Sequence, residues 1–241
     1  MPLPKIATPT YELELPSSGK KIKYRPFLVK EEKVLILALE SEDTRQITNA
    51  VKNILKECIS TRGVKIEDLP TFDIEYIFLN IRGKSIGEAI DLVVTCPDDG
   101  ETTVPVKVYI DEIEIKKDEN HTRDIKLDDK LTLRMKYPSL QQFISSNFDF
   151  KGTDDSAIEE SFNMIGACID MVYSEEESWA ASDCTKKEMS AWIETLNTKQ
   201  FQEIEDFFNT MPKLSHTFKV TNPNTNVESE VTLEGLSNFF A

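Results

Sequence analysis

Polar and apolar residues alternate near the start of the chain, as they do in a strand with one buried face. The alternation covers residues 11–15 and resumes over residues 20–24. Between them, residues 16–19 read Pro-Ser-Ser-Gly, a composition that favours a tight turn. This part of the chain therefore predicts a β-hairpin.

Two segments with helical patterns follow. A helix is predicted to open at Lys30, and its residues 34–39 are all apolar. Because these residues point in every direction around a helix, we expect this helix to be buried on most of its sides. In the next helix, Asp43 and Gln46 have the spacing of a capping box, and apolar residues recur at intervals of three and four over residues 47–59.

A third helix is expected to end at Gly83, since glycine commonly stands just beyond a helix C-terminus. After this helix, apolar residues again recur at every second position, as in a strand. Apolar residues alternate over 90–96 and 102–110, on either side of a Pro-Asp-Asp-Gly turn, and again over 125–137 around the turn 128–130. Two antiparallel hairpins are the natural interpretation.

The last third of the chain predicts three helices and one more hairpin. Helix caps are expected at Ser156, Thr185 and Thr198, and apolar spacing extends the first of these helices to Val172. Residues 214–233 alternate around a central Asn-Pro-Asn-Thr-Asn turn, which indicates a terminal hairpin.

These patterns together predict an α+β fold in which antiparallel β-hairpins are combined with two helical sections. The Gly- and Asp-rich stretch at 149–155 predicts a boundary between an N-terminal section, 1–150, and an acidic C-terminal section, 151–241. One continuous domain is the alternative.

Charge is distributed unevenly along the 241 residues, whose formal net charge is −15. Residues 1–33 carry seven Lys and Arg against four Asp and Glu, whereas residues 34–150 and 151–241 have balances of −7 and −11. A chain this acidic repels phosphate groups, so we expect neither nucleic acid nor an anionic membrane as a partner. The acidic part is either a solvated face or a docking surface for a basic partner.

The cysteines and the N-terminus suggest a protein that acts where it is made. No apolar run approaches the ~20 residues of a membrane span, and the first residues lack the pattern of a signal peptide. The four cysteines are too widely spaced for a zinc site or a disulfide framework, and buried reduced thiols are expected. They are Cys58, Cys96, Cys168 and Cys184.

Catalytic chemistry has little support in the sequence. Gly83-Lys84-Ser85 resembles the end of a phosphate-binding loop, but Phe78 stands where that loop needs its first glycine. His121 is expected to be solvated in a charged loop, and His216 to be a hydrogen-bonded core residue. We therefore predict no catalytic residues, no cofactor and no metal ligands. A Cys-His pair that the fold brings together remains an alternative.

Two groups of residues are candidates for binding a partner protein. One is a basic group close to the N-terminus, made up of Lys20, Lys21, Lys23 and Arg25. The other is the aromatic pair Phe239 and Phe240, which either packs into the core or anchors a contact with another protein.

Residues 3–33, which contain the phrases LPKI, PTYEL and LPSSGKKIKYRPFLVKEEK, resemble the T4-like bacteriophage baseplate hub protein family. The shorter phrases at 72–79, 82–88 and 233–240 support the same resemblance. It implies a non-enzymatic component needed to build the central baseplate hub of a contractile-tailed phage. In relatives the hairpin around Cys96 can carry additional cysteines, and the single one here argues against a metal-knuckle role.

The resemblance implies that other hub or tail proteins are the partners, and a homo-oligomer is a further expectation. We expect the protein in the host cytoplasm during assembly and, if it is retained, in the tail baseplate of the virion. Residues 1–33 are predicted to form one contact surface and the C-terminal helices another. The alternatives are an assembly chaperone absent from the mature virion and a cysteine-dependent hydrolase.

Overall fold

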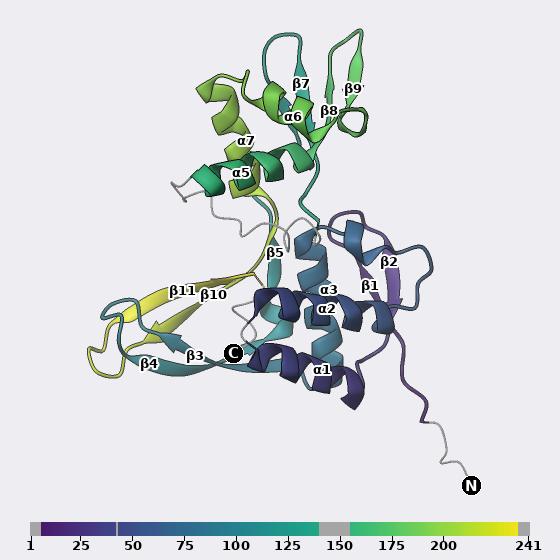
Figure 1. Cartoon of the computed structure of the whole chain (residues 1–241). Helices are drawn as coiled ribbons and strands as arrows, with labels where there is room; N and C mark the ends of the chain where they lie inside the picture. Colours follow the sequence, from purple (N-terminus) through teal and green to yellow (C-terminus); the bar gives the residue numbers. More distant parts are fainter. Residues whose placement is uncertain (1–5, 42, 140–154, 236–241) are drawn as a thin grey trace. The chain divides into compact units, whose positions relative to one another are not determined.

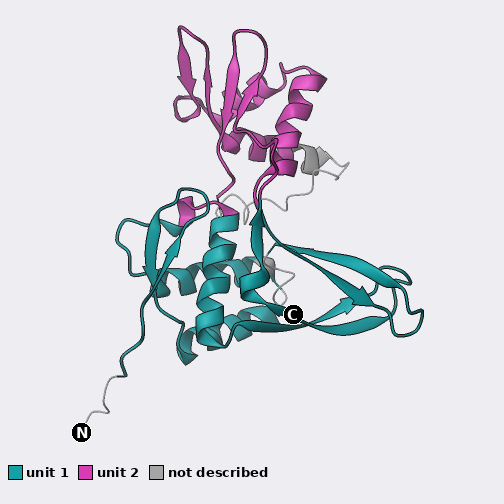
Figure 2. Ribbon diagram, turned by 180° about the vertical axis from the view of Figure 1, so that it is seen from behind, with its two compact units in different colours: residues 1–66, 72–116, 213–241 teal, residues 67–71, 117–212 magenta. Residues whose placement is uncertain are grey.

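The computed structural model of the protein describes residues 6–41, 43–139 and 155–235. These residues form α-helices and small antiparallel sheets, which confirms the predicted α+β class (Figure 1). The chain divides into two compact units, coloured separately in Figure 2. Unit 1 comprises residues 1–66, 72–116 and 213–241, and unit 2 comprises residues 67–71 and 117–212.

Unit 1 begins with a hairpin and a group of helices. Its first elements are β1 (Tyr11–Glu14), β2 (Lys21–Tyr24), α1 (Val29–Glu40), α2 (Thr44–Cys58) and α3 (Thr71–Ser85). Before α3 the chain forms a short 3-10 turn at Ile66–Asp68, most of which is assigned to unit 2. The β1–β2 hairpin confirms the predicted one, and Leu13 lies opposite Ile22 in its register. Asp43 caps α2 by accepting hydrogen bonds from two backbone N–H groups, as expected. Helix α1 packs against α2.

Two long ribbons complete unit 1 (Figure 1). They are built from β3 (Ala89–Thr95), β4 (Thr103–Tyr109), β5 (Glu114–Lys116), β10 (Lys213–Thr221) and β11 (Glu228–Glu234), with a 3-10 turn at Ile110–Glu112. Strands β3 and β4 pair with each other, and β11, β10 and β5 form an antiparallel sheet in that order. The predicted hairpins at 90–110 and 214–233 are thus confirmed. Their inner faces share one apolar cluster with Leu79 of α3, which includes Ile90, Val108 and Leu214.

Unit 2 combines a four-stranded sheet with three described helices. Its elements are β6 (Asp124–Lys126), β7 (Thr132–Met135), α5 (Asp155–Cys168), β8 (Ile169–Tyr173), β9 (Ser178–Ala180), α6 (Lys186–Ile193) and α7 (Thr198–Thr210), with a 3-10 turn at Ala181–Asp183. The sheet is antiparallel in the order β6-β7-β8-β9. The predicted hairpin at 125–137 and the capping box at Thr185 are confirmed. Buried residues of α5, α7 and the sheet form one core, which includes Leu133, Ile165 and Ile204.

Three predicted helix limits in unit 2 are wrong. Helix α5 ends at Cys168, and Val172 lies in β8 opposite Leu133 of β7. A segment rich in β-branched and aromatic residues can form either structure, and here pairing with β7 satisfies its backbone groups. Helix α5 also begins one residue before Ser156. Asn197 rather than Thr198 caps α7, because the Asn197 side chain accepts the N–H of the third helical residue.

Helix α3 also departs from its predicted end. The helix continues through Gly83 and ends at Ser85. A Cβ atom at Gly83 would lie 3.0 Å from Cδ1 of Ile110, closer than most real contacts of a Cβ atom. The glycine therefore permits a close approach of the segment after β4, and it does not stop the helix.

The compact units do not follow the predicted sections 1–150 and 151–241. Strand β10 pairs with β5, with Leu214 opposite Ile115, so the terminal hairpin belongs to unit 1. The expected boundary at 149–155 lies almost wholly outside the described residues. The division of the chain into those two sections stays a prediction.

Candidate partner-binding surfaces

Helix α1 exposes apolar side chains along one side. We call this side the α1 outer face, and its residues are Val29, Lys30, Lys33, Val34, Ile36, Leu37 and Glu40. Its four apolar side chains are 46–79% exposed, whereas Leu35 and Ala38 on the other side are buried. The expectation that residues 34–39 are buried on most sides is therefore wrong. The helix lies at the surface of the described part of unit 1, and the side with Leu35 and Ala38 is the one packed against its described residues.

Glu31 fixes the start of α1. Its carboxylate accepts hydrogen bonds from the Leu28 backbone N–H at 2.7 Å and from Nη2 of Arg25 at 3.0 Å. Burial opposes ionisation of Glu31, but the bonds from Arg25, Leu28 and Lys30 outweigh burial and lower the pKa of the carboxyl group. Arg25 is thus used within the unit to hold α1 in place.

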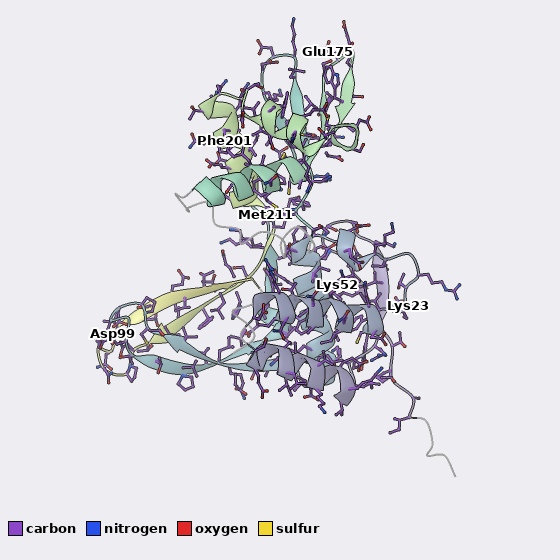
Figure 3. All side chains as sticks on the ribbon, viewed as in Figure 1. Lys23, Lys52, Asp99, Glu175, Phe201 and Met211 are labelled. Carbon is purple, nitrogen blue, oxygen red and sulfur yellow. The ribbon has the colours of Figure 1, made fainter. Side chains whose placement is uncertain are left out.

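The predicted basic group is divided by the fold. Lys20, Lys21 and Lys23 are exposed, and Nζ of Lys23 lies 3.4 Å from a carboxylate oxygen of Glu12 (Figure 3). Arg25 points into the ion pair with Glu31, and the structure does not bring it together with the three lysines. Binding of a partner by these residues stays a prediction. The other candidates, Phe239 and Phe240, lie outside the described residues.

Polar side chains join the tips of the two long hairpins of unit 1. The side-chain nitrogen of Asn222, a residue with no exposed surface, donates to Asp98 at 3.0 Å and to Asp99 at 2.8 Å. The Thr225 hydroxyl donates to Asp98 as well, and Asn224 donates to the Thr102 hydroxyl at 3.0 Å. The Thr102 hydroxyl in turn donates to Asp99, which is labelled in Figure 3. We call this group of six residues the tip clasp: Asp98, Asp99, Thr102, Asn222, Asn224 and Thr225.

Hydrogen bonds lower the pKa of both carboxyl groups of the tip clasp. Thr225 is the main cause at Asp98, and Thr102 is the main cause at Asp99. A carboxyl group whose pKa is lowered by folding stabilises the folded state above its unfolded pKa. That stabilisation is lost as the pH falls through the folded pKa. Acid should therefore open the hairpin tips.

We expect the hairpin tips to lose hydrogen-exchange protection as the pH falls below about 4. The measurement is exchange detected by mass spectrometry on peptides that span 96–102 and 220–228, corrected for the intrinsic pH dependence of exchange. A variant with Asp98→Asn and Asp99→Asn should lack this pH dependence. Unchanged protection in the natural protein between pH 6 and pH 3 would contradict the expectation.

Comparison with known proteins assigns the chain to a family. No curated protein and no solved structure matches it. The family described as T4 bacteriophage base plate protein, however, matches residues 8–241, nearly the whole chain. The chain belongs to the T4 bacteriophage base plate protein family. The predicted resemblance to T4-like baseplate proteins is thereby confirmed.

Membership gives this baseplate protein a location and a general kind of partner. It associates the protein with the phage tail baseplate and indicates other phage tail proteins as partners. It also favours a structural role over an enzymatic one. None of the helices in the described residues combines the length and the apolarity of a membrane span.

Three of the four thiols of the baseplate protein are poor candidates for nucleophiles because they are buried. Cys58, Cys96 and Cys168 are buried, and only Cys184 is exposed. Burial raises the pKa of the Cys58 thiol to about 11 and that of Cys168 to about 12, so these two carry little thiolate at neutral pH. Within the described ranges, no three His, Cys, Asp or Glu side chains, Cys96 included, are grouped as metal ligands would be.

The histidines are held by other residues. His121 is not solvated as expected, because its Nδ1 lies 3.0 Å from the Thr210 hydroxyl and its Nε2 lies 3.0 Å from the Tyr137 hydroxyl. Burial is the main cause that lowers the pKa of His121. His216 is hydrogen-bonded as predicted, through Nδ1 to the Glu112 carbonyl at 3.0 Å.

Sequence reasoning missed the α1 outer face and the central position of Asn222. A signal for the first was present, since six consecutive apolar residues in a helix cannot all face one neighbouring element. Asn222 gave no such signal. It lies in a run of turn residues, and its buried contacts come from a hairpin 123 and 124 residues away in the chain.

Proposed function

We propose that this baseplate protein is a structural or assembly component of the baseplate hub of a contractile-tailed bacteriophage, acting through protein–protein contacts. The observation that carries the proposal is the α1 outer face. Four large apolar side chains on one helix, at 46–79% exposure, have the character of a contact surface, and the described residues of unit 1 do not cover them. Burying them against another protein would supply the apolar centre of an interface.

The exposed basic residues of the first hairpin support the same role. Lys21 and Lys23 lie on the exposed side of β2, and Lys20, just before the strand, is exposed as well. Charges at the rim of an interface speed and orient docking more than they tighten it. The protein would meet its hub partners in the host cytoplasm during assembly.

Quantitative mass spectrometry of purified virions and of isolated hub subassemblies tests the proposal. We expect peptides of this protein in the hub subassemblies at a fixed ratio to the other hub proteins. Retention in virions at that ratio makes it a structural subunit, and its loss on maturation makes it an assembly chaperone. Absence from the hub subassemblies, with peptides found only in peripheral parts of the baseplate, would overturn the hub assignment.

A further inference from the structure

The hairpin of β8 and β9 presents an aromatic residue beside a group of acids. Trp179 of β9 pairs with Val172, yet it is 47% exposed, the most exposed large apolar side chain among the described residues of unit 2. The turn before it contains Glu175, Glu176 and Glu177, all exposed, and Glu175 is labelled in Figure 3. Residues 170–183 include five Asp and Glu and no Lys or Arg.

The turn is held in a defined conformation. The Ser174 hydroxyl accepts hydrogen bonds from the backbone N–H groups of Glu176 and Glu177, at 3.2 and 3.0 Å. The Ser174 N–H donates to the Glu177 carbonyl at 2.8 Å, which closes the turn. The backbone is therefore satisfied locally, and the carboxylates remain at the surface. We call Glu175, Glu176, Glu177 and Trp179 the acidic tip.

The α1 outer face has the complementary character. Val29, Lys33, Ile36 and Leu37 lie at spacings that place them on one side of a helix. Lys33 stands at the centre of this stripe and is exposed, and it forms no ion pair with a described residue. The charged residues of this face are Lys30, Lys33 and Glu40, a balance of +1 in a chain whose net charge is −15, whereas the three glutamates before Trp179 have no basic neighbour in residues 170–183.

We propose that the α1 outer face of one copy of this chain binds the acidic tip of a second copy. The Trp179 ring would cover the apolar residues of the stripe, and the glutamates would surround Lys33. The opposite charges of the two surfaces are the reason to assign a second copy as the occupant. This inference rests on the proposed function, because both use the α1 outer face as a contact surface.

The contact has a consequence for symmetry. It joins two different surfaces, so each copy can bind one neighbour through its helix and another through its hairpin. Such a heterologous contact produces a ring if the rotation closes, and an open chain if it does not. A ring would give this protein several equivalent positions in a baseplate.

Sedimentation of the purified full-length protein at increasing concentration tests for self-association. We expect concentration-dependent assembly that weakens in 1 M salt, where charges are screened beyond about 3 Å. Leu37→Asp should weaken it by about tenfold or more, because a charge would enter the apolar centre of the contact. Val93→Asp is the matched control, since Val93 is 67% exposed on β3 and should leave association unchanged.

A charge exchange then identifies the two surfaces. Lys33→Glu alone and Glu176→Lys alone should each weaken association about fivefold, since each places like charges together. An equal mixture of the two variants should recover it. In the mixture, each contact between one variant and the other again brings a lysine and a glutamate together at positions 33 and 176. Lys126→Glu, an exposed change elsewhere, is the control.

The outcomes separate the inference from the proposed function. A protein that stays monomeric at every concentration, or a mixture that associates no better than its components, overturns the inference. Chemical cross-linking of a mixture of isotopically light and heavy chains gives a further test. If cross-links between α1 and the acidic tip form only within one copy, the inference is overturned as well. If the Leu37→Asp variant is nevertheless lost from hub subassemblies, the proposed function stands and the partner is another hub protein.

Discussion

Replacing Ile36 and Leu37 together with aspartate is expected to reduce incorporation of the protein into baseplates by roughly 500- to 1,000-fold. Central apolar residues of an interface contribute about 2 kcal/mol or more each when they are hot spots, and each 1.4 kcal/mol is a tenfold change. Both side chains are roughly half exposed, at 49 and 56%, so the fold itself should tolerate the change. Exposed substitutions of this kind usually alter folding stability by less than about 0.5 kcal/mol.

The measurement is complementation of a phage that lacks the gene, with plaque yield and baseplate content read together. A matched control replaces Val93 and Val227 with aspartate, because these are also exposed apolar residues of unit 1, at 67 and 45%. The control should support normal assembly. Equal losses in both double variants would show that the α1 outer face has no special part in baseplate assembly. Thermal unfolding of each purified variant excludes misfolding as the cause.

Replacing Asn222 with alanine is expected to lower the free energy of unfolding by about 2–3 kcal/mol, since hydrogen bonds to charged groups contribute about 1.5–3 kcal/mol. Asn222 is fully buried, and its side-chain nitrogen is the donor that joins the turn after β10 to both aspartates of the turn after β3. Its side-chain oxygen also accepts the backbone N–H of Asn224 at 2.8 Å. Alanine removes all of these bonds at once.

Urea unfolding measures the loss, and hydrogen exchange shows where the structure opens. Asn224→Ala is the matched control, because Asn224 is exposed and its side chain donates one bond, to Thr102. We expect the control to lose about 0.5–1 kcal/mol, the usual contribution of one neutral hydrogen bond. If the two alanine variants were equally stable, the tip clasp would not be what joins the two hairpins.

The elements that sequence alone predicted are those whose causes are local. The first hairpin forms because alternating residues flank a four-residue turn, and residues 11 and 24 pair as that turn requires. The caps at Asp43 and Thr185 are hydrogen bonds over two or three residues, so the local sequence contains everything that they need. Membership of the baseplate family was likewise visible in the N-terminal phrases.

The errors have a common physical cause in contacts that the local sequence does not contain. Val172 fits an apolar helical stripe, but β7 offers a strand partner, and the backbone of residues 169–173 pairs with it. Gly83 has the character of a helix stop, yet it lies inside α3 where Ile110 approaches closely. His121 lies among charged residues in the sequence, whereas the fold places it between two hydroxyl groups from distant segments.

The sequence by itself determined the α+β class, the hairpins, most helix positions and the absence of a familiar catalytic motif, because periodicity and turn chemistry act over a few residues. Only the tertiary structure decided which side of α1 is covered and which is left as a contact surface. It also decided that Asn222 and Asp98, 124 residues apart, form one buried hydrogen bond. Burial and long-range pairing depend on which segments meet, and that information lies in the whole chain and not in any segment of it.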